Sequence, residues 1–357
     1  MAFENRYSLF DRWFHRLAFA TTRAQVGLAD LEEKLFKKEL RAFQSKPPLF
    51  VTALPRAGTT ILLEVAYGLP TYATHTYRDM PLVLCPLLRA KLAGKPGAAD
   101  TPVERAHGDG IAITQDSPEA FEEMMWMRFF KRHYPEVGNP PLIEPWSKID
   151  DPEFLRFFAR HRHSIVALRR RQKPGAVRYI SKNNQNIARL GALLDATKGA
   201  AALIPVREPL QHANSLLRQH LRFREMHRED PFARRYMRGI GHFDFGENLR
   251  PIAFDGVREL LERHRPDELQ FWLGYWVCAY RELAKLEGQS RVTFVKFEQL
   301  DRPKVQERLR VVFDAGEAEF RESAARLSVP PSKDVPTDRL ERGTLEEARS
   351  LYERLGG

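Results

Sequence analysis

The sequence is poor in cysteine. Its 357 residues include only Cys85 and Cys278, which lie far apart and form no C-x-x-C pair. The sequence therefore predicts neither a disulfide framework nor a zinc site. It also shows no cluster of carboxylates arranged for a metal ion, so we expect no metal cofactor.

Long apolar runs are also missing. No run approaches the roughly 20 residues that a membrane-spanning helix needs. Near the N-terminus, Asp11, Arg12 and Arg16 interrupt any signal-peptide core. We therefore expect a cytoplasmic protein without a transmembrane segment, whose contact with a membrane would be peripheral at most.

The chain has an excess of positive charge. Its formal net charge is +10 and its pI is about 9.6, which favours anionic partners such as a nucleotide, a polyanionic glycan or a lipid surface. The arginines are spread through predicted helices and no lysine-rich tail is present. This distribution argues against a nucleic-acid partner.

One stretch organises the rest of the sequence. The apolar run Leu49–Leu54 predicts a buried strand, and apolar residues at helical spacing predict a helix from Thr59 or Thr60. Gly58 permits a tight turn between them, and Arg56 lies beside the helix N-terminus. The unpaired N–H groups of such an N-terminus bind anions, and phosphate-like groups fit them well.

An ordinary capped strand–turn–helix would fit this stretch too. The loop lacks the first glycine and the lysine of a Walker A motif, so it is not a standard cradle for ATP or GTP.

A second candidate anion site follows the apolar strand Ala200–Val206. Arg207 lies at the carboxyl end of this strand, where open α/β sheets place their ligands. Ser215, Arg218 and Arg222 follow at helical spacing and form one stripe. A guanidinium and a hydroxyl that converge on one oxyanion suit a phosphate.

The order of elements predicts an α/β fold. Helices separate the predicted strands, so we expect a mostly parallel sheet covered by helices on both faces, with helix-rich additions. The predicted strands are Leu49–Leu54, Thr71–His75, Val177–Ser181, Ala200–Val206 and Arg291–Leu300. Residues 1–46 predict a helical extension that packs on a single domain of residues 47–357, and one of its apolar stripes consists of Leu28, Leu31, Leu35 and Phe36.

Several motifs together resemble a known family. P-R-A-G-T-T (Pro55–Thr60) is similar to the 5′-phosphosulfate loop of sulfotransferases that use 3′-phosphoadenosine 5′-phosphosulfate (PAPS), commonly P-[RK]-S-G-T-T. R-x-P-x5-S from Arg207 to Ser215 resembles their 3′-phosphate motif and follows in the same order. I-S-K-N-N-Q-N, F-W-L-G-Y-W and V-T-F-V-K-F-E-Q-L also fit. The resemblance spans Leu49–Leu300 and is to soluble bacterial members.

The resemblance implies a P-loop-like sulfotransferase fold and a transferase activity. A sulfuryl group would move from PAPS to an acceptor hydroxyl by in-line displacement, and adenosine 3′,5′-bisphosphate would leave. Arg56 would stabilise the transferred group. The residues expected to bind PAPS are Arg56, Ala57, Gly58, Thr59, Thr60, Lys182, Arg207 and Ser215. Ala57 stands where the family has serine, so one hydroxyl donor is absent.

The general base is expected near the end of the second strand, where the family places a His or Glu. His75 is the first candidate and Asp79 the second. His107 and Asp109, in a glycine-flanked segment, are expected to contact the acceptor and are the next candidates for the base.

The basic charge and aromatic residues such as Trp126 and Trp146 favour a carbohydrate or glycolipid acceptor. Two alternatives remain at this point. One is a nucleotide-dependent kinase with a non-standard P-loop, and the other is a non-catalytic module that binds anions or glycans.

Overall fold

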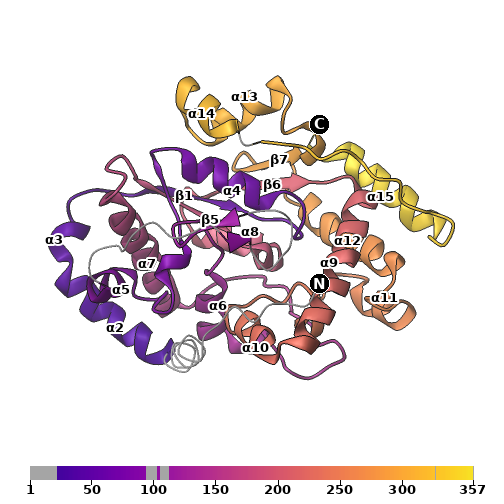
Figure 1. Cartoon of the computed structure of the whole chain (residues 1–357), viewed down its shortest axis with the longest axis horizontal. Helices are drawn as coiled ribbons and strands as arrows, with labels where there is room; N and C mark the ends of the chain where they lie inside the picture. The colour runs from indigo at the N-terminus through magenta and orange to yellow at the C-terminus, as the bar shows by residue number, and fades with distance from the viewer. Residues whose placement is uncertain (1–21, 94–102, 105–111, 326, 357) are drawn as a thin grey trace.

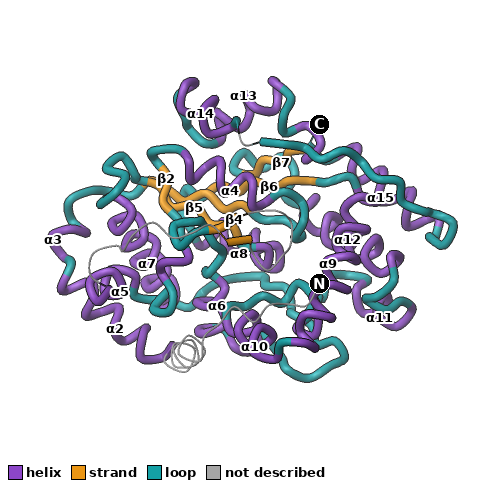
Figure 2. The backbone as a smooth tube through the Cα atoms, in the orientation of Figure 1, coloured by secondary structure: helices purple, strands orange, loops and turns teal. Residues whose placement is uncertain are grey.

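A parallel sheet forms the centre of the molecule. The computed structural model describes residues 22–93, 103–104, 112–325 and 327–356. All neighbouring strands of its five-stranded sheet pair in parallel, and Figure 2 shows this sheet enclosed by helices. In order across the sheet the strands are β2 (Tyr72–Ala73), β5 (Arg178–Lys182), β1 (Lys46–Val51), β6 (Ala201–Val206) and β7 (Val292–Lys296). The predicted α/β class is confirmed.

Helices make up most of the remaining described elements. β3 (Val103–Glu104) and β4 (Ala112–Ile113) form a separate antiparallel pair. The helices of the first half are α2 (Thr22–Leu35), α3 (Lys37–Leu40), α4 (Thr59–Gly68), α5 (Pro86–Ala93), α6 (Glu123–Phe129) and α7 (Pro152–Arg170). Those of the second half are α8 (Leu190–Ala196), α9 (Pro209–Glu229), α10 (Pro231–Gly239), α11 (Val257–Arg263), α12 (Leu269–Ala284), α13 (Pro303–Val312), α14 (Glu317–Ala324) and α15 (Arg342–Arg354).

The side chains of each strand point alternately to the two faces of the sheet. On one face, Leu49 and Val51 of β1 pack with apolar residues of α4, α13 and α14. On the other face, Phe50 of β1 and Ile204 of β6 pack with α7, α8, α9 and α12. Figure 1 shows α13 and α14 above the sheet in that view. Helices therefore cover both faces, as the sequence predicts, because both faces of the sheet are apolar.

The chain leaves the neighbouring strands β1 and β6 in opposite directions. After β1 it enters α4, which packs on the face of Leu49, and after β6 it enters α9, which packs on the face of Phe50. Such a divergence is a topological switch point, where open α/β sheets leave a crevice at the carboxyl ends of their strands. The two predicted anion-binding segments both lie at this edge.

The N-terminal helix α2 packs through a different side than the sequence predicts. Its buried residues are Gln25, Ala29 and Glu32, whereas the stripe of Leu28, Leu31 and Leu35 is 39%, 46% and 52% exposed. Glu32 Oε2 accepts a hydrogen bond of 2.9 Å from the backbone N–H of Leu88 in the first turn of α5. Phe36, the fourth residue of the predicted stripe, packs against the buried cluster that contains Leu40, Leu87 and Leu168.

β1 begins at Lys46, and the division of the chain at residue 46 stays a prediction. Among the described residues, no helix is long and apolar enough to cross a membrane.

Candidate active site

The loop between β1 and α4 has a backbone shape that depends on Gly58. Gly58 is the N-cap of α4 with φ of +93°, a conformation that glycine adopts without strain. A Cβ atom at this position would lie 2.5 Å from the ring of Phe297. Arg56 also has a positive φ, +71°. The loop therefore turns sharply and leaves the N-terminus of α4 open to an anion.

The segment after β6 holds Arg207 beside this loop. Nη1 of Arg207 donates a hydrogen bond of 2.9 Å to the carbonyl oxygen of Arg56, and its guanidinium lies 5.0 Å from the ring centroid of Phe297. Nε of Arg207 is buried and has no hydrogen-bond partner among the described residues. A buried donor without a protein partner indicates that an oxyanion of a ligand accepts its hydrogen bond.

Glu208 and Glu298 fix the start of α9. Glu208 accepts a hydrogen bond of 2.8 Å from the N–H of Gln211, and Pro209 occupies the first turn. The N–H of Glu208 in turn donates to Glu298 Oε1 at 3.0 Å. Burial lowers the pKa of Arg207, the charge of Glu298 raises it, and the charge of Arg56 lowers it further. The guanidinium stays protonated because its ordinary pKa lies far above neutrality.

The loop and α9 line a common cavity of about 780 Å³, a size in the range of ligand pockets. Arg56 Nε and Ser215 Oγ lie 3.5 Å apart across it. The segment 328–333 lines another side of the cavity and is bound to Gln211. Gln211 Nε2 donates a hydrogen bond of 2.6 Å to the carbonyl oxygen of Lys333, and Gln211 Oε1 accepts one of 2.9 Å from the Lys333 N–H. The cavity is lined by Arg56, Gly58, Thr59, Thr60, Ile61, Arg207, Gln211, Asn214, Ser215, Arg218, Gln219, Arg222, Phe297, Ser328, Pro330, Pro331 and Lys333.

His212 supports the loop from beneath. Its Nε2 lies 2.7 Å from the carbonyl oxygen of Pro55, and its Nδ1 accepts a hydrogen bond of 3.1 Å from Trp276 Nε1. These two partners require a neutral ring with its proton on Nε2. Burial, followed by the charge of Arg207, lowers the pKa of His212 to about 3. The neutral ring therefore connects α12 to the loop through two hydrogen bonds.

Six of the residues predicted to bind PAPS line this cavity, and two do not. The six are Arg56, Gly58, Thr59, Thr60, Arg207 and Ser215. Ala57 is buried in the apolar core, so only its backbone could face an anion. Lys182 ends β5 next to Val51 of β1, outside the residues that line the cavity.

The prediction that His75 or Asp79 is the base does not fit their positions. His75 is 1% exposed and Asp79 is 2% exposed. His75 Nε2 lies 3.1 Å from Nε2 of the buried His161, and Asp79 forms an ion pair with Arg169. A general base must reach the proton that it removes. We correct the prediction for this physical reason, since both side chains are sealed under α7.

The electrostatics of this buried cluster agree with a structural role. Burial alone would raise the pKa of Asp79, but the charge of Arg169, the nearby ring of His75 and a hydrogen bond from the Thr76 N–H hold it below its usual value. Burial, and then the neighbouring His75, lower the pKa of His161 well below its ordinary range. Asp79 is therefore a paired carboxylate in the interior.

The predicted acceptor contacts His107 and Asp109 lie outside the described residues. Trp126 and Trp146, which favoured a glycan acceptor, are buried. The guanidinium of Arg189 lies 4.1 Å and 5.1 Å from their ring centroids. Both tryptophans therefore belong to the core and cannot stack on a sugar, which corrects that interpretation.

The sequence did not single out Gln211, Phe297 and Lys333 as part of the site. Phe297 directly follows β7, and its place after a parallel strand was the available signal. Lys333 had none, because it meets Gln211 across 122 residues of sequence. Within the described part of the chain, no group of three or more His, Cys, Asp or Glu side chains could hold a metal ion.

The arrangement can bind an anionic ligand, because two chain segments bring donors to one cavity. The N-terminus of α4 offers backbone donors to one group, and Arg207, Ser215 and the exposed Arg218 and Arg222 offer side-chain donors to another. Guanidinium groups bind phosphate in two-point geometry. The cavity therefore suits a ligand that carries phosphate-like groups.

Comparisons with known proteins return solved structures only. No family model and no curated protein matches the chain. The chain is similar to sulfotransferase STF1 from Mycobacterium tuberculosis H37Rv, with 14% identity, a TM-score of 0.46, and coverage of 89% of this chain and 80% of that one. It is also similar to sulfotransferase STF9 from Mycobacterium avium, with 14% identity, a TM-score of 0.44, and coverage of 84% and 73%.

A third similar structure is the sulfotransferase domain of the Synechococcus PCC 7002 olefin synthase. It shows 13% identity, a TM-score of 0.36, and coverage of 86% of this chain and 94% of that one. At such identities and TM-scores the likeness carries no argument about function. The argument about function rests on the cavity itself. Each of these three similar structures is a sulfotransferase or a sulfotransferase domain.

Proposed function

We propose that the protein is a sulfotransferase that moves a sulfuryl group from PAPS to an acceptor hydroxyl. One observation carries the proposal: a single cavity is lined by the loop Arg56–Thr60 and by Arg207 and Ser215. PAPS has a phosphosulfate at the 5′ position and a phosphate at the 3′ position, which matches two sets of anion donors on one cavity.

Each side of the cavity has its own task in this proposal. Arg56 and the N–H groups at the start of α4 bind the 5′-phosphosulfate and stabilise the charge that develops on the leaving phosphate. Arg207, with its unsatisfied buried Nε, and Ser215 bind the 3′-phosphate. In-line displacement needs the acceptor oxygen opposite the leaving group, so the acceptor enters from the side of the loop away from the nucleotide.

For the acceptor we propose a hydroxyl of a carbohydrate or glycolipid. The net charge of +10 supports it, because anionic glycans and lipid surfaces are attracted to a basic protein. The buried tryptophans do not add support.

A thermal melt tests the proposed donor. Adenosine 3′,5′-bisphosphate at 100 times its dissociation constant should stabilise the protein by about 2.7 kcal/mol, in the absence of Mg²⁺. ATP with Mg²⁺ is the control ligand. Greater stabilisation by ATP with Mg²⁺ would favour a kinase instead. Stabilisation by the bisphosphate should then be followed by a mass-shift screen of sugars, phenols and lipids with PAPS.

A further inference from the structure

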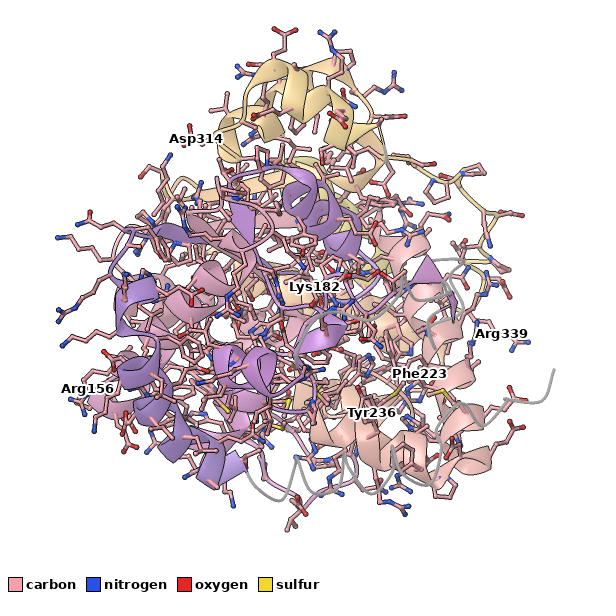
Figure 3. The ribbon with its side chains drawn as sticks, turned by 60° about the vertical axis from the view of Figure 1, so that its left-hand side comes forward. Arg156, Lys182, Phe223, Tyr236, Asp314 and Arg339 are labelled. Atoms are coloured by element: carbon pink, nitrogen blue, oxygen red, sulfur yellow. The ribbon has the colours of Figure 1, made fainter. Side chains whose placement is uncertain are left out.

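The outer side of α2 carries an exposed apolar stripe. Of the seven large apolar side chains that are exposed in the described part of the chain, three lie on α2, namely Leu28, Leu31 and Leu35. Their spacing of i, i+3 and i+7 puts them on one side of the helix. α2 packs on α7, and Figure 1 shows α2 and α3 at one edge of the molecule. Figure 3, which turns this side forward, labels Arg156 of α7 at the margin.

The surface acids of α2 and α3 are paired with arginines of the protein body. Asp30 and Glu33 both form ion pairs with Arg160 of α7, and Glu39 of α3 pairs with Arg171 at the end of α7. Asp30 and Glu33 each come two residues after a leucine of the stripe, which is about half a turn around the helix. The acids therefore lie away from the stripe, and the protein itself offsets their charge.

The cations near the stripe have no such partner. Four of them are exposed and form no ion pair with any residue that the structure describes, and they are Lys34, Lys37, Lys38 and Arg41. Lys34 comes three residues after Leu31, so the two side chains are neighbours on the helix surface. The other three cations lie in α3 and directly after it. An exposed apolar stripe is thus bordered by uncompensated positive charge.

This combination suits an anionic lipid surface. A helix that lies in a membrane interface inserts apolar side chains at the level of the headgroups, while its lysine and arginine side chains bind anionic lipids. A second copy of the chain fits the surface less well. A two-fold dimer would bring the same patch against itself, and its cations would then face one another.

We propose that α2 and α3 form a docking surface for anionic lipid bilayers, with Leu28, Leu31 and Leu35 among the headgroups and the four cations bound to lipid phosphates. The docking surface is separate from the cavity between the loop and α9, so it does not depend on the proposed sulfotransferase function. Binding is reversible and depends on salt, because exposed charges are screened beyond about 10 Å at 0.1 M salt.

Vesicle flotation tests the docking surface. The protein should float with vesicles of equal parts phosphatidylcholine and phosphatidylglycerol, remain in solution with phosphatidylcholine alone, and be released by salt. Leu31→Gln and Lys34→Gln should each weaken binding roughly threefold to tenfold. Leu221→Gln is the matched apolar control, since Leu221 of α9 is 43% exposed and Leu31 is 46% exposed. Lys304→Gln, which changes an exposed lysine of α13, is the charge control. Both controls should bind like the parent protein.

Several outcomes would overturn the docking surface. The parent protein could fail to bind the mixed vesicles, or the α2 variants could bind them as well as the controls do. Light scattering that shows a dimer in the parent protein and a monomer in Leu31→Gln, without vesicle binding, would assign the surface to a second copy. A lower melting temperature of Leu31→Gln than of Leu221→Gln would show that the chain itself covers the stripe. Binding of adenosine 3′,5′-bisphosphate without vesicles should be equal in all of these proteins, which keeps the test independent of the proposed function.

Discussion

The carboxyl ends of two parallel strands in this sheet differ in what lies over them. The end of β1 opens on the cavity, where Arg56 and Thr60 face Ser215 of α9. The end of β2 is closed, because α7 brings His161 and Arg169 against His75 and Asp79. Position at a strand end therefore indicates a functional site only where the following chain leaves that end uncovered.

The covering helix explains the difference. α4 and α9 depart to opposite faces and leave a gap between them. At β2 the chain turns into a short 3-10 helix, Tyr77–Asp79, whose Asp79 accepts a hydrogen bond of 2.9 Å from the N–H of Thr76. Arg169 Nε donates a hydrogen bond of 3.0 Å to the carbonyl oxygen of Thr74. Polar groups that could serve chemistry are here used to hold the closed end together.

The largest expected effect comes from breaking the closed end. Arg169→Met leaves Asp79 as an unpaired buried carboxylate, so the free energy of unfolding should fall by about 3–5 kcal/mol. Arg78→Met is the matched control, because the ion pair of Arg78 and Asp116 is part-exposed and should cost at most about 1 kcal/mol. Urea unfolding measures both. If Arg169→Met lowered the free energy of unfolding as little as Arg78→Met, the ion pair of Arg169 and Asp79 would not stabilise the closed end.

The second effect is a pH dependence at the open end. His212 has a pKa near 3 in the folded protein and about 6.5 when unfolded. Between these values the unfolded state binds more protons, so the free energy of unfolding falls as pH falls, by about 2 kcal/mol from pH 7 to pH 5. His212→Gln should remove this part of the dependence. The contributions of His220 and His227, whose pKa values are also lowered, cancel in the comparison. An unchanged dependence of the unfolding free energy on pH would contradict a neutral His212 in the folded protein.

The third effect tests the turn of the loop. Gly58→Ala places a Cβ against the ring of Phe297 with φ of +93° and should cost about 1–2 kcal/mol of unfolding free energy. Binding of adenosine 3′,5′-bisphosphate should also weaken. Gly27→Ala is the control, since nothing lies within 4 Å of its added Cβ in α2 and alanine favours a helix. A Gly58→Ala protein that binds as well as the parent would show that the loop shape is not needed.

The smallest effect concerns Ser215. Ser215→Ala removes one neutral donor from the cavity, so binding of the bisphosphate should weaken by about 0.5–1.5 kcal/mol while stability stays unchanged. Isothermal calorimetry and a thermal melt measure the two quantities. A larger loss of stability than of binding would assign Ser215 to the fold instead.

The sequence predicts the sheet and the open end well but not the closed one. Five strands and the stripe of Ser215, Arg218 and Arg222 follow from local patterns, because periodicity records burial. His75 looked like a base because its strand ends near β1, but the contacts that seal it come from α7, 86 residues away from His75 at His161.

The central claim is that Arg207 reads the 3′-phosphate, and four dissociation constants test it most directly. Calorimetry would measure the dissociation constants of adenosine 3′,5′-bisphosphate and adenosine 5′-monophosphate from the parent protein and from Arg207→Ala. Because Arg207 also donates to the carbonyl of Arg56, both ligands will lose some affinity, and the ratio isolates the 3′ contact. The account predicts that the preference for the bisphosphate falls by about 1.5–3 kcal/mol in the variant. An unchanged preference would contradict it.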